Sequence, residues 1–159
     1  MTSNPSVVCV GGTSRSGSTL LHLMLGSSPN SFSVGEIESW FRPTDRHHHT
    51  LECACGDEYC SVWSELRELR PSHFHKSAAL KSGVDYIIDS SKSLSWLIDV
   101  GRWSYRNTMH VRYVFVWKEP IDLAFSFWKR GHEIGHWRRE FVKYYRRMLQ
   151  VPFPMRTVR

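Results

Sequence analysis

A segment rich in glycine and hydroxyl side chains, GGTSRSGST at 11–19, has the residue types of a phosphate-binding loop. Its spacing nearly fits the nucleotide-binding pattern G-x-x-x-x-G-K-[ST], with Gly12, Gly17 and Thr19 in place and Ser18 where the lysine belongs. That lysine neutralises the β- and γ-phosphates, so its absence argues against a kinase or an ATPase. Arg15 supplies a cation from inside the loop instead. The segment therefore predicts an anion site with a relocated charge, and a purely structural turn is the alternative.

This loop offers three kinds of anion-binding group. Its glycines permit tight turns with free backbone amides, and a helix that begins near Ser18 adds the positive end of its dipole. Hydroxyl side chains add further donors. The predicted anion-binding residues of the loop are Thr13, Ser14, Arg15, Ser16, Gly17, Ser18 and Thr19.

Hydrophobic patterning places this loop between a strand and a helix of an α/β domain. Strands are predicted at 6–12, 31–36, 85–91 and 111–118, and helices at 18–28, 62–70, 73–83, 94–105, 120–131 and 136–150. Strands that alternate with helices indicate a parallel sheet, whose ligands bind beyond the carboxyl ends of the strands. The polar groups GGTSRSGST, GE, DSSK and KEP follow the four strands and should gather at that edge.

Two helices carry patterns that predict which of their faces are buried. Leu20, Leu21, Met24 and Leu25 are expected to form one apolar face of the helix at 18–28. The helix at 136–150 has a stripe of large side chains that indicates core packing rather than a platform for stacking bases. The members of that stripe are Trp137, Phe141, Tyr144, Tyr145 and Met148.

The loop GTSRSGSTLL resembles the 5′-phosphosulfate-binding loop of sulfotransferases that use 3′-phosphoadenosine 5′-phosphosulfate (PAPS), and Arg15 matches the basic residue of that loop. These enzymes resemble P-loop kinases in fold. The resemblance implies a P-loop-like three-layer α/β sandwich with a central parallel sheet.

The family's second signature is a strand that ends in Arg-Asp-Pro, followed by a helix with a serine, and it holds the 3′-phosphate. VFVWKEPIDLAFSF at 114–127 resembles it, with Lys118 at the arginine position and Ser126 at the serine position. Lysine keeps the charge but lacks the bidentate fork of arginine, so weaker binding of the 3′-phosphate is expected. The alternative is an ordinary strand end and an ordinary helix residue.

The resemblance also assigns catalytic roles beside Arg15. In the tyrosylprotein branch, a glutamate placed much like Glu36 is the catalytic base, so Glu36 is predicted to take the acceptor's proton. Glu38 competes for this role, and Glu36 as a helix-terminal charge is the alternative. IIDSSKS resembles the family's Asp-Ser-Ser-Lys stretch, which implies that Lys92 stabilises charge on the bridging oxygen; a solvated lysine is the alternative. PAPS is the implied co-substrate, and nothing in the resemblance calls for a metal.

A cysteine- and histidine-rich excursion is expected at about 42–61. Cys53, Cys55 and Cys60 are one ligand short of a structural zinc site, and one of the histidines at 47–49 would complete it. A disulfide or three free thiols are the alternatives, and a cytoplasmic setting weighs against the disulfide. The excursion resembles a Cys-rich segment of many bacterial sulfotransferases, which leaves metal binding open.

Composition predicts a single domain over residues 1–159 in the cytoplasm, since no apolar run approaches a membrane span and no secretory signal is evident.

The net charge of +6 is concentrated in residues 102–159, as expected for a solvated basic helix face or for a surface that binds nucleic acid, anionic lipid or a polyanion. Because the chain resembles sulfotransferases, nucleic acid is not an expected partner. The acceptor (carbohydrate, lipid, peptide or small phenol) and the oligomeric state stay open.

Sulfotransferases usually continue well beyond the point where this sequence stops, and MRTVR at 155–159 resembles the beginning of their next strand. The sheet is therefore expected to be incomplete at its C-terminal side, as in a truncated sulfotransferase, with weak or no turnover in isolation and donor binding partly kept. The other hypotheses are a kinase-like P-loop enzyme and a non-catalytic fragment that binds an anion or nucleic acid.

Overall fold

The central element of the fold is a five-stranded parallel sheet in the order β2-β3-β1-β4-β5. The computed structural model describes residues 4–44, 60–151 and 155–158. The strands are β1 Ser6–Gly12, β2 Ser31–Gly35, β3 Tyr86–Asp89, β4 His110–Val116 and β5 Met155–Val158. The helices are α1 Ser18–Gly26, α2 Glu38–Phe41, α3 Ser61–Leu66, α4 Pro71–Ser82, α5 Leu94–Arg106, α6 Pro120–Trp128 and α7 Ile134–Met148. The predicted α/β class with a parallel sheet is thus confirmed.

The boundaries differ from the sequence prediction where polar residues follow a strand. β3 ends at Asp89 and β4 at Val116, so Ser90, Ser91 and Lys118 lie in the loops beyond the strands. The four-residue helix α2 was not predicted, because it is too short to show a periodic pattern. β5 forms on the segment predicted to begin a strand, and it pairs with β4, with Met155 opposite Tyr113.

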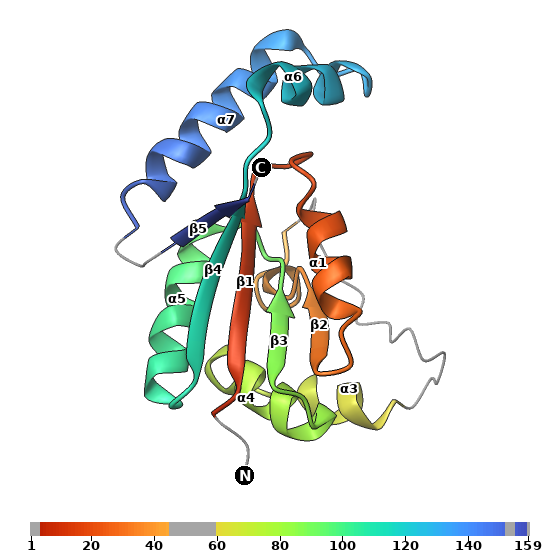
Figure 1. Cartoon of the computed structure of the whole chain (residues 1–159), viewed down its shortest axis with the longest axis vertical. Helices are drawn as coiled ribbons and strands as arrows, with labels where there is room; N and C mark the ends of the chain where they lie inside the picture. The colour runs from red at the N-terminus through yellow and green to blue at the C-terminus, as the bar shows by residue number, and fades with distance from the viewer. Residues whose placement is uncertain (1–3, 45–59, 152–154, 159) are drawn as a thin grey trace.

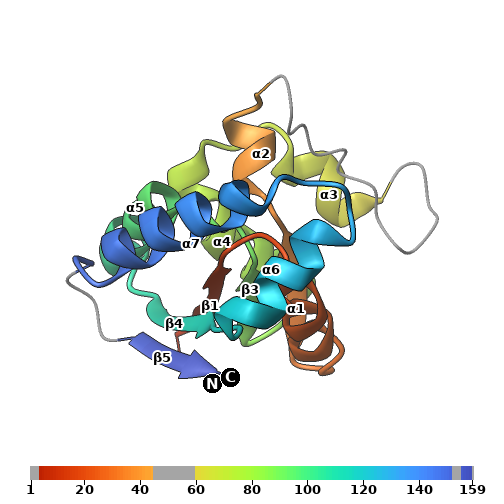
Figure 2. The same cartoon turned by 90° about the horizontal axis from the view of Figure 1, so that it is seen from above.

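Side chains of β1 alternate between the two faces of the sheet and so specify three layers. Val7 and Cys9 belong to the main core, which also contains buried residues of α3, α4, α5 and α7. Val8 and Val10 face the other way, against Leu21 and Leu25 of α1. Figures 1 and 2 show the sheet between α1 on one side and α5 on the other. The predicted three-layer sandwich is confirmed.

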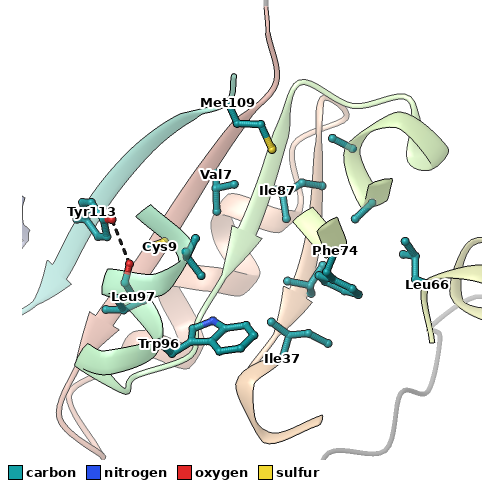
Figure 3. Packing of buried hydrophobic residues seen from close by; sticks show 14 of the residues in the cluster. Val7, Cys9, Ile37, Leu66, Phe74, Ile87, Trp96, Leu97, Met109 and Tyr113 are labelled. Atoms are coloured by element: carbon teal, nitrogen blue, oxygen red, sulfur yellow. Dashed lines mark hydrogen bonds between the residues drawn. The ribbon is translucent and has the colours of Figure 1, made fainter. Parts of the chain in front are cut away.

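The main core combines aliphatic side chains with large aromatic rings, among them Phe74, Trp96 and Tyr113 (Figure 3). Phe74 of α4 and Trp96 of α5 are fully buried, and the ring of Phe41 packs against both, at centroid distances of 5.4 Å and 5.8 Å. The buried hydroxyl of Tyr113 on β4 donates a hydrogen bond of 3.1 Å to the Leu97 carbonyl of α5. The core therefore holds α4 and α5 against the same face of the sheet.

The predicted apolar face of α1 is wrong in two of its four members. Leu21 and Leu25 pack on the sheet, but Leu20 and Met24 are 65% and 63% exposed. The buried face of α1 instead begins with Ser18, which is only 2% exposed. The helix is apolar around most of its circumference, so periodicity alone does not specify which side meets the sheet.

Two tyrosines of α7 hold the carboxyl ends of the two central strands. The Tyr144 hydroxyl accepts a 2.8 Å hydrogen bond from the Gly12 amide at the end of β1. The Tyr145 hydroxyl donates to the Val116 carbonyl at the end of β4, at 3.0 Å. Gly11 makes this approach possible, because a Cβ there would lie 2.5 Å from the Phe115 ring and 3.0 Å from the Tyr144 hydroxyl. Phe141, Tyr144, Tyr145 and Met148 of the predicted stripe pack in the main core, whereas Trp137 belongs to neither core cluster and contacts Phe141. Through its two tyrosines the stripe also anchors the glycine-rich loop.

Replacing Tyr144 with phenylalanine should loosen the start of this loop, because the buried Gly12 amide loses its acceptor while the ring stays in place. We expect the Gly12 amide to exchange with solvent about tenfold faster, since a lost buried hydrogen bond costs about 1–3 kcal/mol. Amide hydrogen exchange measured by NMR checks this. Tyr105→Phe is the matched control, because Tyr105 is 86% exposed. Equal exchange of Gly12 in both variants would contradict the anchoring role.

Candidate functional site

A cleft of about 1240 Å³ opens at the carboxyl edge of the sheet, where the loops that follow β1, β2 and β3 meet α6. Such an edge is where open parallel sheets bind their ligands. Among the residues predicted from the sequence, eight line this cleft: Ser14, Arg15, Gly17, Ser18, Thr19, Glu36, Lys92 and Ser126. The cleft also has cationic side chains that the sequence prediction did not single out: Arg42, Lys129 and Arg130.

The glycine-rich loop has backbone angles that favour glycine at several positions. Gly12 and Gly17 have φ angles of 145° and 103°, which explains their presence at the two ends of the loop. Arg15 has a φ of 69° although it is not glycine, a conformation that costs about 1–3 kcal/mol. Strain of this kind gathers at functional sites, where the surrounding structure holds it. The Arg15 side chain is exposed at the cleft.

Two hydroxyl residues predicted to bind the anion lie beneath the loop rather than in the cleft. The side chains of Thr13 and Ser16 are only 4% and 7% exposed. The Ser16 hydroxyl has no hydrogen-bond partner among the described residues, and it occupies the space of a Cβ at Gly12, 2.7 Å away. Burying a hydroxyl that has no hydrogen-bond partner destabilises the folded protein. A group that bonded to the Ser16 hydroxyl would therefore remove this cost.

The structure brings the two predicted signature segments together through Lys118. Its ammonium donates a 2.6 Å hydrogen bond to the Ser126 hydroxyl of α6, which in turn donates to the Asp122 carbonyl at 2.9 Å. The same ammonium lies 3.4 Å from the Arg15 carbonyl of the glycine-rich loop. Lys118 thus links the glycine-rich loop to α6, although it does not itself line the cleft, and its role in binding a ligand stays a prediction.

Glu36 and Lys92, predicted as catalytic base and as charge stabiliser, form an ion pair across the cleft. Glu36 follows β2 and Lys92 follows β3, and the two side chains are 44% and 23% exposed. Because the carboxylate is open to the cleft, an incoming hydroxyl can replace the ammonium as its hydrogen-bond partner. The pair thus places a proton acceptor and a cation at one point of the site.

Glu38, the competitor of Glu36, also lines the cleft but has different partners. Burial raises the pKa of its carboxyl group, while the Ser93 hydroxyl and the Arg42 guanidinium partly offset this rise. Arg42 lies 3.7 Å from Glu38, pairs with Asp99 at 2.7 Å, and stacks 5.2 Å from the centre of the Trp96 ring. Glu38 is thus engaged with the wall of the cleft, whereas Glu36 contacts the lysine.

A fully buried carboxylate holds the loop that carries Lys92. Asp89, at the end of β3, accepts hydrogen bonds of 2.8 Å from the side chains of His75 and Trp96 and from the Ser91 amide. The Ser91 hydroxyl then accepts a 3.0 Å bond from the Glu38 amide. This network ties the loop after β3 to the segment after β2, so it fixes the two sides of the Glu36–Lys92 pair. Asp89 and Ser91 lie in the DSSK motif, but no local pattern indicates their distant partners.

His22 of α1 is a further titratable group of this region that sequence reasoning missed. Burial lowers the pKa of its imidazole, Glu36 acts in the opposite direction, and Lys92 adds to the decrease. Its Nδ1 atom is buried without a hydrogen-bond partner among the described residues. Its sequence signal was weak, since a single histidine interrupts an otherwise apolar helix.

The predicted zinc cluster lies mostly outside the described residues, which exclude Cys53 and Cys55; Cys60 is partly buried at the start of α3. Over the described ranges 4–44, 60–151 and 155–158, the structure has no group of three His, Cys, Asp or Glu side chains placed to hold a metal ion. Within those ranges, no helix has the length and apolar character needed to cross a membrane. The predicted cytoplasmic location stays a prediction.

Comparison with known proteins gives no match that identifies a family. No family model matches the chain, and no curated protein has a matching sequence.

Replacing Asp89 with asparagine should destabilise the fold by about 2–3 kcal/mol, because the amide turns a donor toward groups that need an acceptor. Urea unfolding measures this change. Asp99→Asn is the control, since Asp99 bonds only to exposed arginines and should lose at most about 0.5 kcal/mol. If Asp89→Asn and Asp99→Asn lowered the free energy of unfolding by similar amounts, the buried Asp89 carboxylate would have no special role in stability.

Proposed function

We propose that this chain is a cytoplasmic sulfotransferase domain that binds PAPS and transfers its sulfuryl group to a hydroxyl or amine acceptor. The observation that carries the proposal is the position of Lys118, which bonds to Ser126 and reaches the carbonyl of Arg15. This contact between two segments about a hundred residues apart, each with the pattern of one phosphate-binding signature, supports the proposal that both serve one ligand.

The described residues fit an elongated ligand with two anionic ends. Arg15, Ser18, Thr19 and the start of α1 offer a cation, hydroxyls and helix-terminal amides to one end. Lys118 offers its ammonium to the other end and is held by the Ser126 hydroxyl, which itself donates to the Asp122 carbonyl. Ser126, Lys129 and Arg130 line this part of the cleft.

Bound PAPS supplies a sulfuryl group: as the acceptor oxygen bonds to sulfur, the bond between sulfur and the phosphate oxygen breaks, and adenosine 3′,5′-bisphosphate leaves with that electron pair. Glu36 accepts the proton of the acceptor hydroxyl once that hydroxyl displaces Lys92. The released Lys92 ammonium is then free to stabilise negative charge on the departing phosphate. Asp89 and Ser91 hold the backbone segments that carry Glu36 and Lys92 while these side chains exchange partners.

Calorimetry with adenosine 3′,5′-bisphosphate tests the donor site without requiring turnover. We expect this nucleotide to bind and ATP–Mg²⁺ not to bind. Arg15→Ala and Lys118→Ala should each weaken binding about tenfold or more, because each removes a charge-assisted contact to phosphate. Arg106→Ala is the matched control, since Arg106 is exposed in the last turn of α5 and should leave binding unchanged.

Three outcomes would contradict the proposal. Mg²⁺-dependent binding of ATP in place of the bisphosphate would favour a kinase-like enzyme. Salt-sensitive binding of DNA or RNA that Arg15→Ala leaves unchanged would favour a nucleic-acid-binding fragment. If Arg106→Ala weakened binding of the bisphosphate as much as Arg15→Ala does, the nucleotide would be attracted by the overall positive charge of the chain and not by a specific site.

A further inference from the structure

A second cavity, of about 510 Å³, is lined by Lys92 of the Glu36–Lys92 pair and plays no part in the proposed donor site. It shares Lys92 and Ser93 with the first cleft, and the beginning of α5 and one face of α7 form its walls. Its volume falls within the range of about 300–1,000 Å³ that is typical of small-molecule sites. A molecule in this cavity would have one end at the lysine that the proposed transfer uses.

The floor of the cavity is apolar. Leu94 and Ile98 of α5 and Val151, which follows α7, line it together with the ring of Tyr144. The Tyr144 hydroxyl is already engaged by the Gly12 amide, so the ring contributes an apolar surface to the cavity. These side chains suit a compact aromatic or aliphatic body rather than a carbohydrate, which would need many hydrogen-bond partners.

The far wall is positively charged. Glu140, Lys143, Tyr144 and Arg147 of α7 are spaced so that they share one face of the helix, and all four line the cavity. Neither Lys143 nor Arg147 forms an ion pair within 4.0 Å with another residue of the described part of the chain. The cavity lining therefore contains three cations, of which Lys92 is paired with Glu36, and a single carboxylate, so positive charge is in excess.

The N-terminal end of α5 adds to this positive potential. α5 has thirteen residues, and its first turn, which lines the cavity, contains no acidic side chain. The positive end of the helix dipole is thus not neutralised by its own sequence. Two cations and an unneutralised helix end beside an apolar floor favour a ligand that has both an apolar body and a negative charge.

We infer that this cavity holds the acceptor, and that the acceptor is a small hydroxyl compound with an apolar body and a terminal anionic group such as a carboxylate. Arg147 and Lys143 bind the anionic group, Leu94, Ile98 and Val151 contact the body, and the hydroxyl lies toward Lys92 and Glu36. This inference rests on the proposed function, because it takes its reacting group from the donor site.

The test uses two phenols that differ only in charge, 3-(4-hydroxyphenyl)propionate and its neutral amide, with the full chain. Calorimetry first establishes that adenosine 3′,5′-bisphosphate binds, and the phenols are then titrated with and without saturating nucleotide. We expect the carboxylate to bind about tenfold more tightly than the amide, as a charge-assisted contact predicts. Arg147→Gln and Lys143→Gln should each reduce this preference and leave nucleotide binding unchanged. Arg146→Gln is the matched control, since Arg146 is exposed on the same helix and does not line the cavity.

Each failure has a distinct signature. If the nucleotide binds but the two phenols bind equally, or if neither binds, the inference is overturned while the proposed function stands. If Arg147→Gln weakens nucleotide binding, the cavity belongs to the donor and the acceptor assignment is wrong. If the nucleotide does not bind at all, the proposed function fails and the acceptor role with it, whatever the phenols do. Equal effects of Arg146→Gln and Arg147→Gln would also overturn the inference.

Discussion

All five strands of the sheet run in the same direction, and the candidate site depends on this constraint. Because the carboxyl ends of parallel strands share an edge, the polar segments after β1, β2, β3 and β4 lie close together although they are far apart in the sequence. Buried contacts then determine how precisely they meet. Asp89 joins the loop after β3 to α4 and α5, and Tyr144 and Tyr145 join the ends of β1 and β4 to α7.

The side chains that hold the loops in place differ from those that face the cleft. The groups that fix the loops are buried, as with Asp89 at 0% exposure, whereas Arg15, Glu36 and Lys92 remain open to the cleft. Among the described residues, Arg15 in the loop and Thr108 before β4 are the non-glycine residues with a positive φ, and of the two only Arg15 lines the cleft. In the proposed transfer the Glu36–Lys92 ion pair must rearrange, since each partner needs a new contact. The second cavity is also lined by Lys92, so one lysine separates the two proposed ligands.

Much of the fold and the membership of the cleft could be predicted from local patterns. Strand and helix periodicities gave the parallel sheet, and polar residues after strands gave the edge where Arg15, Glu36, Lys92 and Ser126 gather. The apolar face of α1 was wrong because Leu20 and Met24 are as apolar as the residues that pack. Arg42, His75 and Tyr144 were missed as parts of the site because their roles depend on partners that tertiary packing supplies.

The central claim, that segments 12–19 and 118–126 form one site for a bisphosphorylated adenosine, is tested most directly by NMR. The ¹H–¹⁵N spectrum of the labelled chain would be followed during titration with adenosine 3′,5′-bisphosphate. The account predicts that the largest shifts fall together on amides of both segments, with those around Arg106 unchanged. Shifts confined to the exposed basic residues of α7, such as Arg138 and Arg139, would contradict it, as would shifts in only one of the two segments.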